Sequence, residues 1–427
     1  MNILVIGSGG REHAIINSIS KSNKCSKIFA LPGNGGTELL AENLSGDVND
    51  FELIKKISLK YKISLVFVGP EDPIVNGIYD FFKSDSQLKD INIIAPSKQA
   101  GLLEGSKDFA KDFMQKYNIP TAKHKTFSIE NIDEADKFLE SMSPPYVLKA
   151  DGLAAGKGVY ICEDTERAKN AVVEIFNGKF GKAEQVLVEE FLQGEEMSYF
   201  VISDGKTFKK FNTAQDHKRV GEGDNGKNTG GMGAYCPSGL INEELDAKIV
   251  EKIIKPTFKA INDMGAVYKG FLYVGLMIKN NNPYLVEYNV RMGDPECQTI
   301  LPLLKSDLLE LILSCCDENL ENSIVEWEDK KSICVVLCSK GYPDKYRENV
   351  EISNLDKIIN DKNIFVYHAG TQLINNKVYS TGGRVLNFVC ISDDLKVSRE
   401  TVIKEIENLN WKNGFYRKDI GFRIIDK

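Results

Sequence analysis

The sequence has no run of about 18 apolar residues, which is the length that a membrane-spanning helix needs. Its N-terminus has no basic region, and the apolar run from Ile3 to Ile6 is too short for a signal peptide. We therefore expect a cytoplasmic protein without a membrane partner.

Cysteine pairs with metal-site spacing and an excess of positive charge are also missing. The nine cysteines include no Cys-x-x-Cys pair, and an odd number fits a reducing compartment better than a disulfide framework. The net charge of −7 disfavours a protein that binds nucleic acid in general. What remains is an ordinary globular composition, with 42% hydrophobic and 27% charged residues. A chain of 427 residues is long enough for about two to four domains.

The first hundred residues alternate short apolar strands with helical patterns, which is typical of a parallel, doubly wound sheet. Strands are expected at 2–6, 27–31, 65–68 and 91–95, and helices at 11–20, 51–61 and 78–83. Glycine or polar residues follow three strands, at 7–10, 34–37 and 69–71. Because ligands bind at the carboxyl edge of such sheets, we expect a binding site there.

The turn Gly7-Ser8-Gly9-Gly10 is similar to a dinucleotide fingerprint but departs from it twice. The third glycine is replaced by Glu12, and no acidic residue follows the second strand to bind a ribose. Both departures count against a nicotinamide dehydrogenase. Free N–H groups of Gly9 and Gly10 at a helix start would favour a phosphate, and a turn without a ligand is the alternative.

A second glycine loop, 149–158, follows a strand predicted at 146–150 and contains Lys149 and Lys157. It is not a Walker loop, because its glycines are separated by three residues and Gly158 replaces the hydroxyl residue. Such a loop can still fold over a triphosphate. A solvated surface loop is the alternative.

Polar residues alternate along 285–291, so Glu287, Asn289 and Arg291 share one face of a predicted strand. The strand before it, 271–278, is apolar on both faces and is expected to be central, with a hairpin joining the two. A carboxylate and an amide oxygen suit magnesium, and an arginine suits a carboxylate or phosphate. A face open to water is the alternative. The polar stretch 215–233 is expected to be loop-like, with a mobile part at 228–235.

Eight motifs, in this order along the chain, resemble the phosphoribosylamine–glycine ligase (glycinamide ribonucleotide synthetase) family, ATP-grasp enzymes of purine synthesis. They lie at 7–13, 32–37, 69–71, 104–107, 149–158, 215–219, 228–235 and 291–296. The resemblance extends from residue 1 to about residue 390, and the motifs at 215–219 and 228–235 are the most specific.

The resemblance implies an α/β fold in three parts. An N-terminal Rossmann-like parallel-sheet domain would span 1–103, an ATP-grasp core 104–327 with a mobile lid at about 120–192, and a small C-terminal α/β domain 328–427. ATP, with Mg²⁺ or Mn²⁺, would phosphorylate glycine. The amine of 5-phospho-β-D-ribosylamine would then attack the glycyl phosphate to give glycinamide ribonucleotide, ADP and phosphate. A monomer or weak homodimer is expected.

The resemblance also implies roles for individual residues. ATP contacts are implied for Lys107, Lys149, Gly156, Lys157, Gly158, Glu189, Glu190, Phe191, Leu192 and Glu195. Metal ligation is implied for Glu287 and Asn289, and catalytic roles around the glycine for Asp216, Lys218 and Arg291. Substrate contacts are implied for Gly9, Gly10, Gly36, Glu71, Asp216, Arg291, Gly293 and Asp294.

One feature departs from the wider ATP-grasp pattern. The strand predicted at 271–278 supplies no further carboxylate, which puts a two-metal site made wholly of protein ligands in doubt. Two other functions stay open. Another ATP-grasp carboxylate–amine ligase would differ in the N-terminal motifs, and a nucleotide-binding regulator would not need the whole set of lysines, Glu287, Asn289 and Arg291.

Overall fold

The N-terminal part forms a five-stranded parallel sheet with the order β3-β2-β1-β4-β5. The computed structural model describes residues 1–152, 158–179, 181, 183–358 and 361–426. The strands are β1 (Asn2–Gly7), β2 (Lys27–Pro32), β3 (Glu42–Asn43), β4 (Ile63–Val68) and β5 (Asn92–Ile94). The helices are α1 (Gly10–Ile19), α2 (Phe51–Lys60), α3 (Glu71–Asn76), α4 (Ile78–Ser84) and α5 (Lys98–Gly105). The predicted parallel sheet is confirmed, and the ends of β2, β1 and β4 lie side by side at one edge.

A four-stranded antiparallel sheet forms the middle of the molecule, in the order β11-β10-β16-β17. Its strands are β10 (Glu195–Ser203), β11 (Phe208–Lys210), β16 (Gly270–Lys279) and β17 (Asn282–Asn289). Nearby helices are α6 (Lys107–Lys116), α9 (Glu243–Ile249) and α10 (Lys255–Asp263), with a π-helical turn at Val250–Ile254. The predicted hairpin is confirmed, and β16 is central as expected. Asn280 and Asn281 both have positive φ, as a tight two-residue turn requires.

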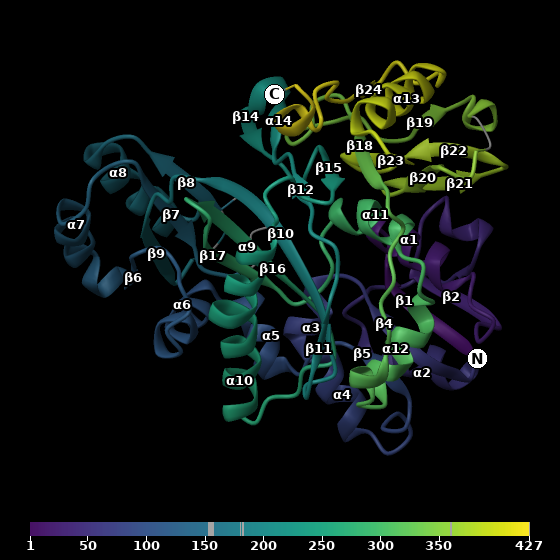
Figure 1. Ribbon diagram of the computed structural model, residues 1–427, viewed down its shortest axis with the longest axis horizontal. Coiled ribbons are helices and arrows are strands. Elements are labelled where there is room, and N and C mark those ends of the chain that lie inside the picture. The colour runs from purple at the N-terminus through teal and green to yellow at the C-terminus, as the bar shows by residue number, and fades with distance from the viewer. Residues whose placement is uncertain (153–157, 180, 182, 359–360, 427) are drawn as a thin grey trace.

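A separate antiparallel sheet, β6-β9-β7-β8, projects to the left in Figure 1. Its strands are β6 (His124–Ser128), β7 (Tyr146–Ala150), β8 (Val159–Cys162) and β9 (Gln185–Glu190). Helices α7 (Ile132–Glu140) and α8 (Thr165–Phe176) pack against it, and α8 is capped by the Asp164 carboxylate, which accepts from Arg167 N. These elements bury an apolar cluster of their own. This unit lies within the stretch 120–192 for which a lid is predicted, and it is called the lid below; its mobility stays a prediction.

The C-terminal part is built on a sheet with the order β12-β15-β18-β23-β20, beside which β24 pairs with β18. The strands are β12 (Gln215–Asp216), β15 (Gly233–Cys236), β18 (Lys331–Ser339), β20 (Ile364–His368), β23 (Arg384–Ser392) and β24 (Gly414–Phe415). A small sheet holds β19 (Val350–Ile352), β21 (Thr371–Ile374) and β22 (Lys377–Ser380). The remaining helices are α11 (Glu296–Ile300), α12 (Leu308–Cys316), α13 (Leu395–Glu407) and α14 (Phe422–Ile425).

The stretch 215–233 differs from the predicted loop. It contains the short strands β12, β13 (Arg219–Gly221) and β14 (Asn225–Asn228), and it runs into β15. The reason is tertiary: β15 pairs with β18 from the C-terminal part, and β12 then pairs with β15. Gln215, Asp216 and His217 are consequently buried rather than solvated.

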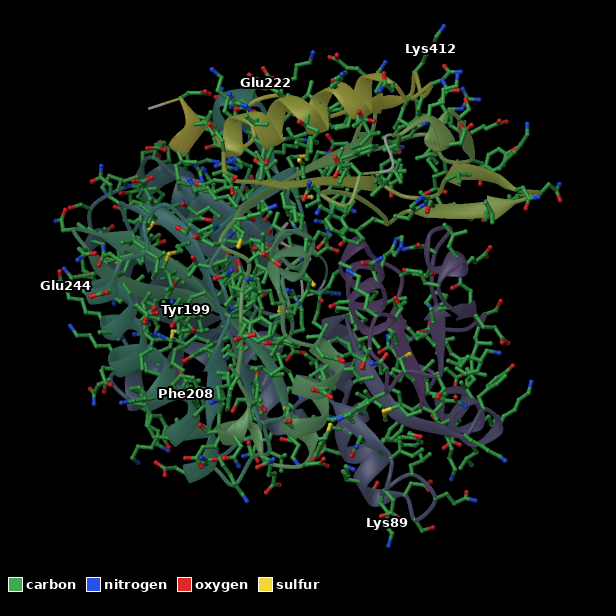
Figure 2. All side chains as sticks on the ribbon, turned by 45° about the vertical axis from the view of Figure 1, so that its right-hand side comes forward. Lys89, Tyr199, Phe208, Glu222, Glu244 and Lys412 are labelled. Atoms are coloured by element: carbon green, nitrogen blue, oxygen red, sulfur yellow. The ribbon has the colours of Figure 1, made fainter. Side chains whose placement is uncertain are left out.

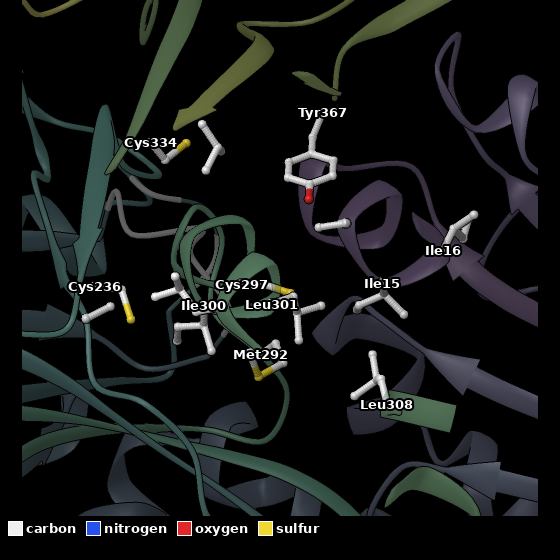
Figure 3. Close-up of a cluster of buried hydrophobic side chains, with 14 of the residues drawn as sticks. Ile15, Ile16, Cys236, Met292, Cys297, Ile300, Leu301, Leu308, Cys334 and Tyr367 are labelled. Atoms are coloured by element: carbon white, nitrogen blue, oxygen red, sulfur yellow. The ribbon is translucent and has the colours of Figure 1, made fainter. Parts of the chain in front are cut away.

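One apolar core joins the N-terminal, middle and C-terminal parts. Figure 3 shows Ile15 of α1, Cys297 and Ile300 of α11, Cys334 of β18 and Tyr367 of β20 within the same cluster. Cys334 is fully buried and acts as a small core residue. All nine cysteines are free thiols.

Charged side chains cover the outside of the molecule. Figure 2 shows Lys89, Glu244 and Lys412 at its periphery, and all three are exposed. Tyr199 of β10, by contrast, is buried. Within the described part of the chain, no helix has both the length and the apolar character to cross a membrane.

Candidate active site

A cleft of about 800 Å³ lies where the N-terminal sheet, the lid, the middle sheet and the C-terminal part meet. It collects most of the residues that the sequence singled out. The predicted residues that line it are Gly9, Glu71, Lys107, Lys149, Gly158, Glu189, Glu190, Phe191, Leu192, Asp216, Lys218, Glu287, Asn289, Arg291 and Asp294. Segments more than 200 residues apart in sequence thus share one site.

Four predicted site residues do not line this cleft. Gly10 packs against Gln298 and Asn387, and Gly36 packs against His13 and His368, so both are covered by other side chains. Gly293 packs against the Glu296 carboxylate. Glu195 is exposed at the start of β10, whereas its neighbour Glu196 faces the cleft. Two further predicted residues, Gly156 and Lys157, lie outside the described residues.

The start of α1 corrects the expectation of a free N–H at Gly9. Glu12, at the third position of the helix, folds back so that its Oε2 accepts from Gly9 N at 2.6 Å. Arg11 Nε in turn donates to Glu12 Oε1 at 2.5 Å. The residue that breaks the dinucleotide fingerprint therefore occupies the position in which that fingerprint would bind a phosphate.

Two lysines mark the end of the cleft near the lid. Lys107, the first residue of α6, donates from Nζ to the carbonyl of Gly152 at 2.6 Å, and its backbone N–H donates to Asp151 at 2.6 Å. Burial lowers the pKa of Lys107, although nearby carboxylates oppose this. Lys149 of β7 forms an ion pair with Glu189 of β9 at 2.5 Å. This end therefore has the positive charge that a polyphosphate needs.

Glu287 and Asn289 lie two residues apart on β17 and both line the cleft. The Nδ2 atom of Asn289 is buried without a hydrogen-bond partner, so this amide has unused hydrogen-bonding capacity. Among the described residues, no group of three or more His, Cys, Asp or Glu could hold a metal ion. One carboxylate and one amide oxygen nevertheless fit a cation such as Mg²⁺, which completes its shell with water and substrate phosphates.

Asp216 and Lys218 flank the next section of the cleft. Lys218 Nζ pairs with Glu196 Oε2 at 2.9 Å. Burial, together with the carboxylates of Glu296 and Glu196, raises the pKa of Asp216 to about 8 against the opposing effect of Lys218. A carboxylate that is reluctant to ionise when the site is empty becomes a good partner for an incoming ammonium group.

We expect the kcat/KM for glycine to fall about tenfold per pH unit below pH 8, since only ionised Asp216 would hold the glycine ammonium. The measurement is initial ADP release between pH 6 and 9, with the other substrates saturating at each pH. Asp216→Asn should lower kcat/KM and remove this slope. An unchanged slope in Asp216→Asn would assign the titration to another group.

Arg291 connects two carboxylates in the part of the cleft near the N-terminal sheet. Its Nη2 donates to Glu104 Oε1 at 2.5 Å and its Nε to Glu71 Oε2 at 3.2 Å. Burial would raise the pKa of Glu71, but Arg291 and Arg11 lower it to about 2. Burial raises the pKa of Glu104 to about 7, although Arg291 opposes this. The guanidinium thus links the segment just after β17 to both α3 and α5.

Several cleft residues had no role in the sequence analysis. They include Lys111, Glu104, Glu196, Glu296, Arg384 and Arg423. Glu104 and Glu296 lie within the motifs at 104–107 and 291–296, so their motif membership could have identified them as site residues. Arg384 and Arg423 come from the C-terminal part, where Arg384 donates to the carbonyls of Gly230 and Asp294 and Arg423 pairs with Asp224. No sequence pattern indicated that these arginines would reach the cleft.

Known proteins match the chain along nearly its whole length. Three phosphoribosylglycinamide synthetase domain models match it: the N domain at 1–104, the ATP-grasp (A) domain at 105–297 and the C domain at 332–423. A phosphoribosylamine–glycine ligase from Caldanaerobacter subterraneus subsp. tengcongensis is 45% identical over 98% of this chain and 99% of its own. A phosphoribosylamine–glycine ligase from Haemophilus influenzae is 43% identical over 100% of this chain and 99% of its own length.

A solved structure agrees with these matches. The crystal structure of a phosphoribosylamine–glycine ligase from Thermotoga maritima superposes with a TM-score of 0.85 at 31% identity, covering 98% of this chain and 100% of that one. The three-part fold that the sequence predicted is thereby confirmed, while the exact domain boundaries stay predictions. The chain belongs to the phosphoribosylglycinamide synthetase family.

Proposed function

We propose that this chain joins glycine to 5-phospho-β-D-ribosylamine at the expense of ATP, giving glycinamide ribonucleotide, ADP and phosphate. The proposal is supported above all by one observation: the cleft holds cations for a polyphosphate, a carboxylate and lysine suited to an amino acid, and an arginine beside the edge of the N-terminal sheet. Relatives named phosphoribosylamine–glycine ligase cover the whole length of the chain.

In the first step, a glycine carboxylate oxygen attacks the γ-phosphorus of ATP and ADP leaves. Lys107 and Lys149 would bind the phosphates, with the 189–192 segment beside the adenine. Glu287 and Asn289 would hold a divalent cation, Mg²⁺ or Mn²⁺, which when bound neutralises phosphate charge. Asp216 would hold the glycine ammonium and Lys218 the carboxylate.

In the second step, the amine of phosphoribosylamine attacks the carbonyl carbon of glycyl phosphate, and phosphate leaves as the amine loses a proton. Gly9, Glu71 and Asp294 face the part of the cleft where this substrate would lie. Arg291 lies between Glu71 and the middle sheet, where it would stabilise the charge of the departing phosphate. The nine free thiols are compatible with a cytoplasmic enzyme, which we propose to be a monomer or weak homodimer.

The test is ADP release by the purified protein with ATP, magnesium and glycine, with and without phosphoribosylamine made in situ from ribose 5-phosphate and ammonia. We expect turnover only when both glycine and phosphoribosylamine are present. Turnover with a different acid or amine instead would keep the ligase chemistry and discard these substrates. ATP binding without turnover on any substrate would indicate a regulator.

A further inference from the structure

A single buried carboxylate lies between two buried lysines at the nucleotide end of the cleft. Glu189 Oε1 is 2.5 Å from Lys111 Nζ, and Glu189 Oε2 is 2.5 Å from Lys149 Nζ. The Glu189 side chain is 3% exposed, so it needs a positive partner at all times. Burial would raise its pKa, but the two ammonium groups lower it to about 2.

The two lysines are held differently. Lys111 Nζ also donates to Thr121 Oγ1 at 2.6 Å, and Thr121 Oγ1 donates to the carbonyl of Leu285 at 2.6 Å. Lys111 is therefore fixed between β9 and β17 from its position in α6. For Lys149, Glu189 is the one partner recorded among the described residues, and the Lys149 side chain is three times as exposed as that of Lys111, 9% against 3%.

We propose that Lys111 is a positioning residue for ATP: it remains the counter-ion of Glu189 and so allows Lys149 to turn from Glu189 to the nucleotide phosphates. The inference rests on the proposed function, which puts ATP in this cleft. It adds Lys111 to the proposed site and gives the two lysines different roles: Lys111 neutralises Glu189, and Lys149 binds the phosphates. With Lys111 present, moving Lys149 leaves Glu189 neutralised. Without Lys111, moving Lys149 would leave a bare buried carboxylate, which is costly.

The experiment measures the binding of ATP with magnesium, and of adenosine alone, by isothermal titration calorimetry. Lys111→Met keeps the length of the side chain and removes its charge. Because Glu189 then retains Lys149, we expect the Kd for ATP to rise about tenfold or more, while the Kd for adenosine stays within about twofold of the wild-type value. A residue that only shapes the adenine pocket would weaken both ligands alike, and that result would overturn the proposal.

A double variant tests the mechanism itself. In Lys111→Met with Glu189→Gln the buried carboxylate is gone, so Lys149 is free to bind phosphate. Relative to Glu189→Gln alone, the added Lys111→Met change should therefore raise the Kd for ATP by less than about threefold. A rise of about tenfold or more between Glu189→Gln and the double variant would overturn the proposal, because Lys111 would then act on ATP without Glu189. Should Lys111→Met alone not fold, this comparison still decides, because the double variant removes one charge of each sign.

Lys116→Met is the matched control, because Lys116 lies on the same helix but is exposed and outside the cleft. It should leave both Kd values unchanged. Wild-type protein that does not bind ATP at all would instead count against the proposed function. Wild-type ATP binding with an unaffected Lys111→Met would reject the present inference alone.

Discussion

Glu287→Ala should lower turnover by about a thousandfold or more, equivalent to about 4 kcal/mol of transition-state stabilisation, while the protein stays folded. Glu287 is the one carboxylate of the proposed metal site, and it is exposed to the cleft on an edge strand. Its removal would leave Asn289 alone to hold the cation, but it would break no hydrogen bond or ion pair recorded for the described residues. The effect should therefore be on catalysis and not on stability.

The measurement is ADP release with all substrates, together with the melting temperature of the same preparation. Glu251→Ala is the control, since Glu251 is an exposed carboxylate whose one ion-pair partner in the described part of the chain is Lys255 on its own helical segment. Glu251→Ala should change neither the rate of ADP release nor the melting temperature by much. Near-normal turnover in Glu287→Ala would remove Glu287 from the metal site.

Arg291→Met should lower both activity and stability. We expect turnover to fall by at least about a thousandfold, because the charge beside the acyl phosphate is lost. We also expect the free energy of unfolding at pH 8 to fall by about 3–5 kcal/mol, since Glu104, whose side chain is 7% exposed, would lose its cation.

The stability loss should depend on pH. Without Arg291, the pKa of Glu104 rises further, because Arg291 opposes the effect of burial more than the Val290 N–H group and Arg11 do. The folded variant then binds a proton that the unfolded chain releases above about pH 4.5, so its stability decreases as pH rises. Urea unfolding should thus show a smaller loss at pH 6 than at pH 8.

A second substitution separates the two effects. Glu104→Gln added to Arg291→Met should recover most of the stability, because an amide needs no counter-ion, but it should not recover activity. Arg399→Gln serves as the control: Arg399 pairs with the half-exposed Asp426 on the outside of the molecule and should contribute less than about 1 kcal/mol. Recovery of turnover in the double variant would mean that Arg291 acts only by holding Glu104.

The sequence was most informative where local rules decide the structure. The apolar runs of β1, β2 and β4 and the alternation along β17 predicted the strands, and the parallel order followed from the helices between them. Glu287 and Asn289, two residues apart on that strand, both line the cleft, and Arg291 lines it from just beyond the strand. The motif order supplied Lys107, Lys149 and Asp216, which all face the same cleft.

The sequence failed where distant segments decide the structure. Residues 215–233 looked like a solvated loop, yet β15 is drawn into a sheet by β18, about 100 residues later. Lys111 had no role in the sequence analysis, because only folding places it beside Glu189 and Thr121. Gly9 looked free to bind a phosphate, because side-chain direction at Glu12 cannot be obtained from spacing alone.

The C-terminal part contributes to the wall of the cleft, and this limits how the C-terminal part can be exchanged between relatives during evolution. Gly421 N donates to His217 Nε2, and Arg417 and Arg423 both pair with Asp224. Residues 417–423 therefore hold the segment that carries Asp216 in place. The C-terminal part is therefore not a module that can be exchanged independently of the rest of the chain. A chimaera that takes its C-terminal part from a distant relative would have to inherit the partners of Asp224 and His217 along with it.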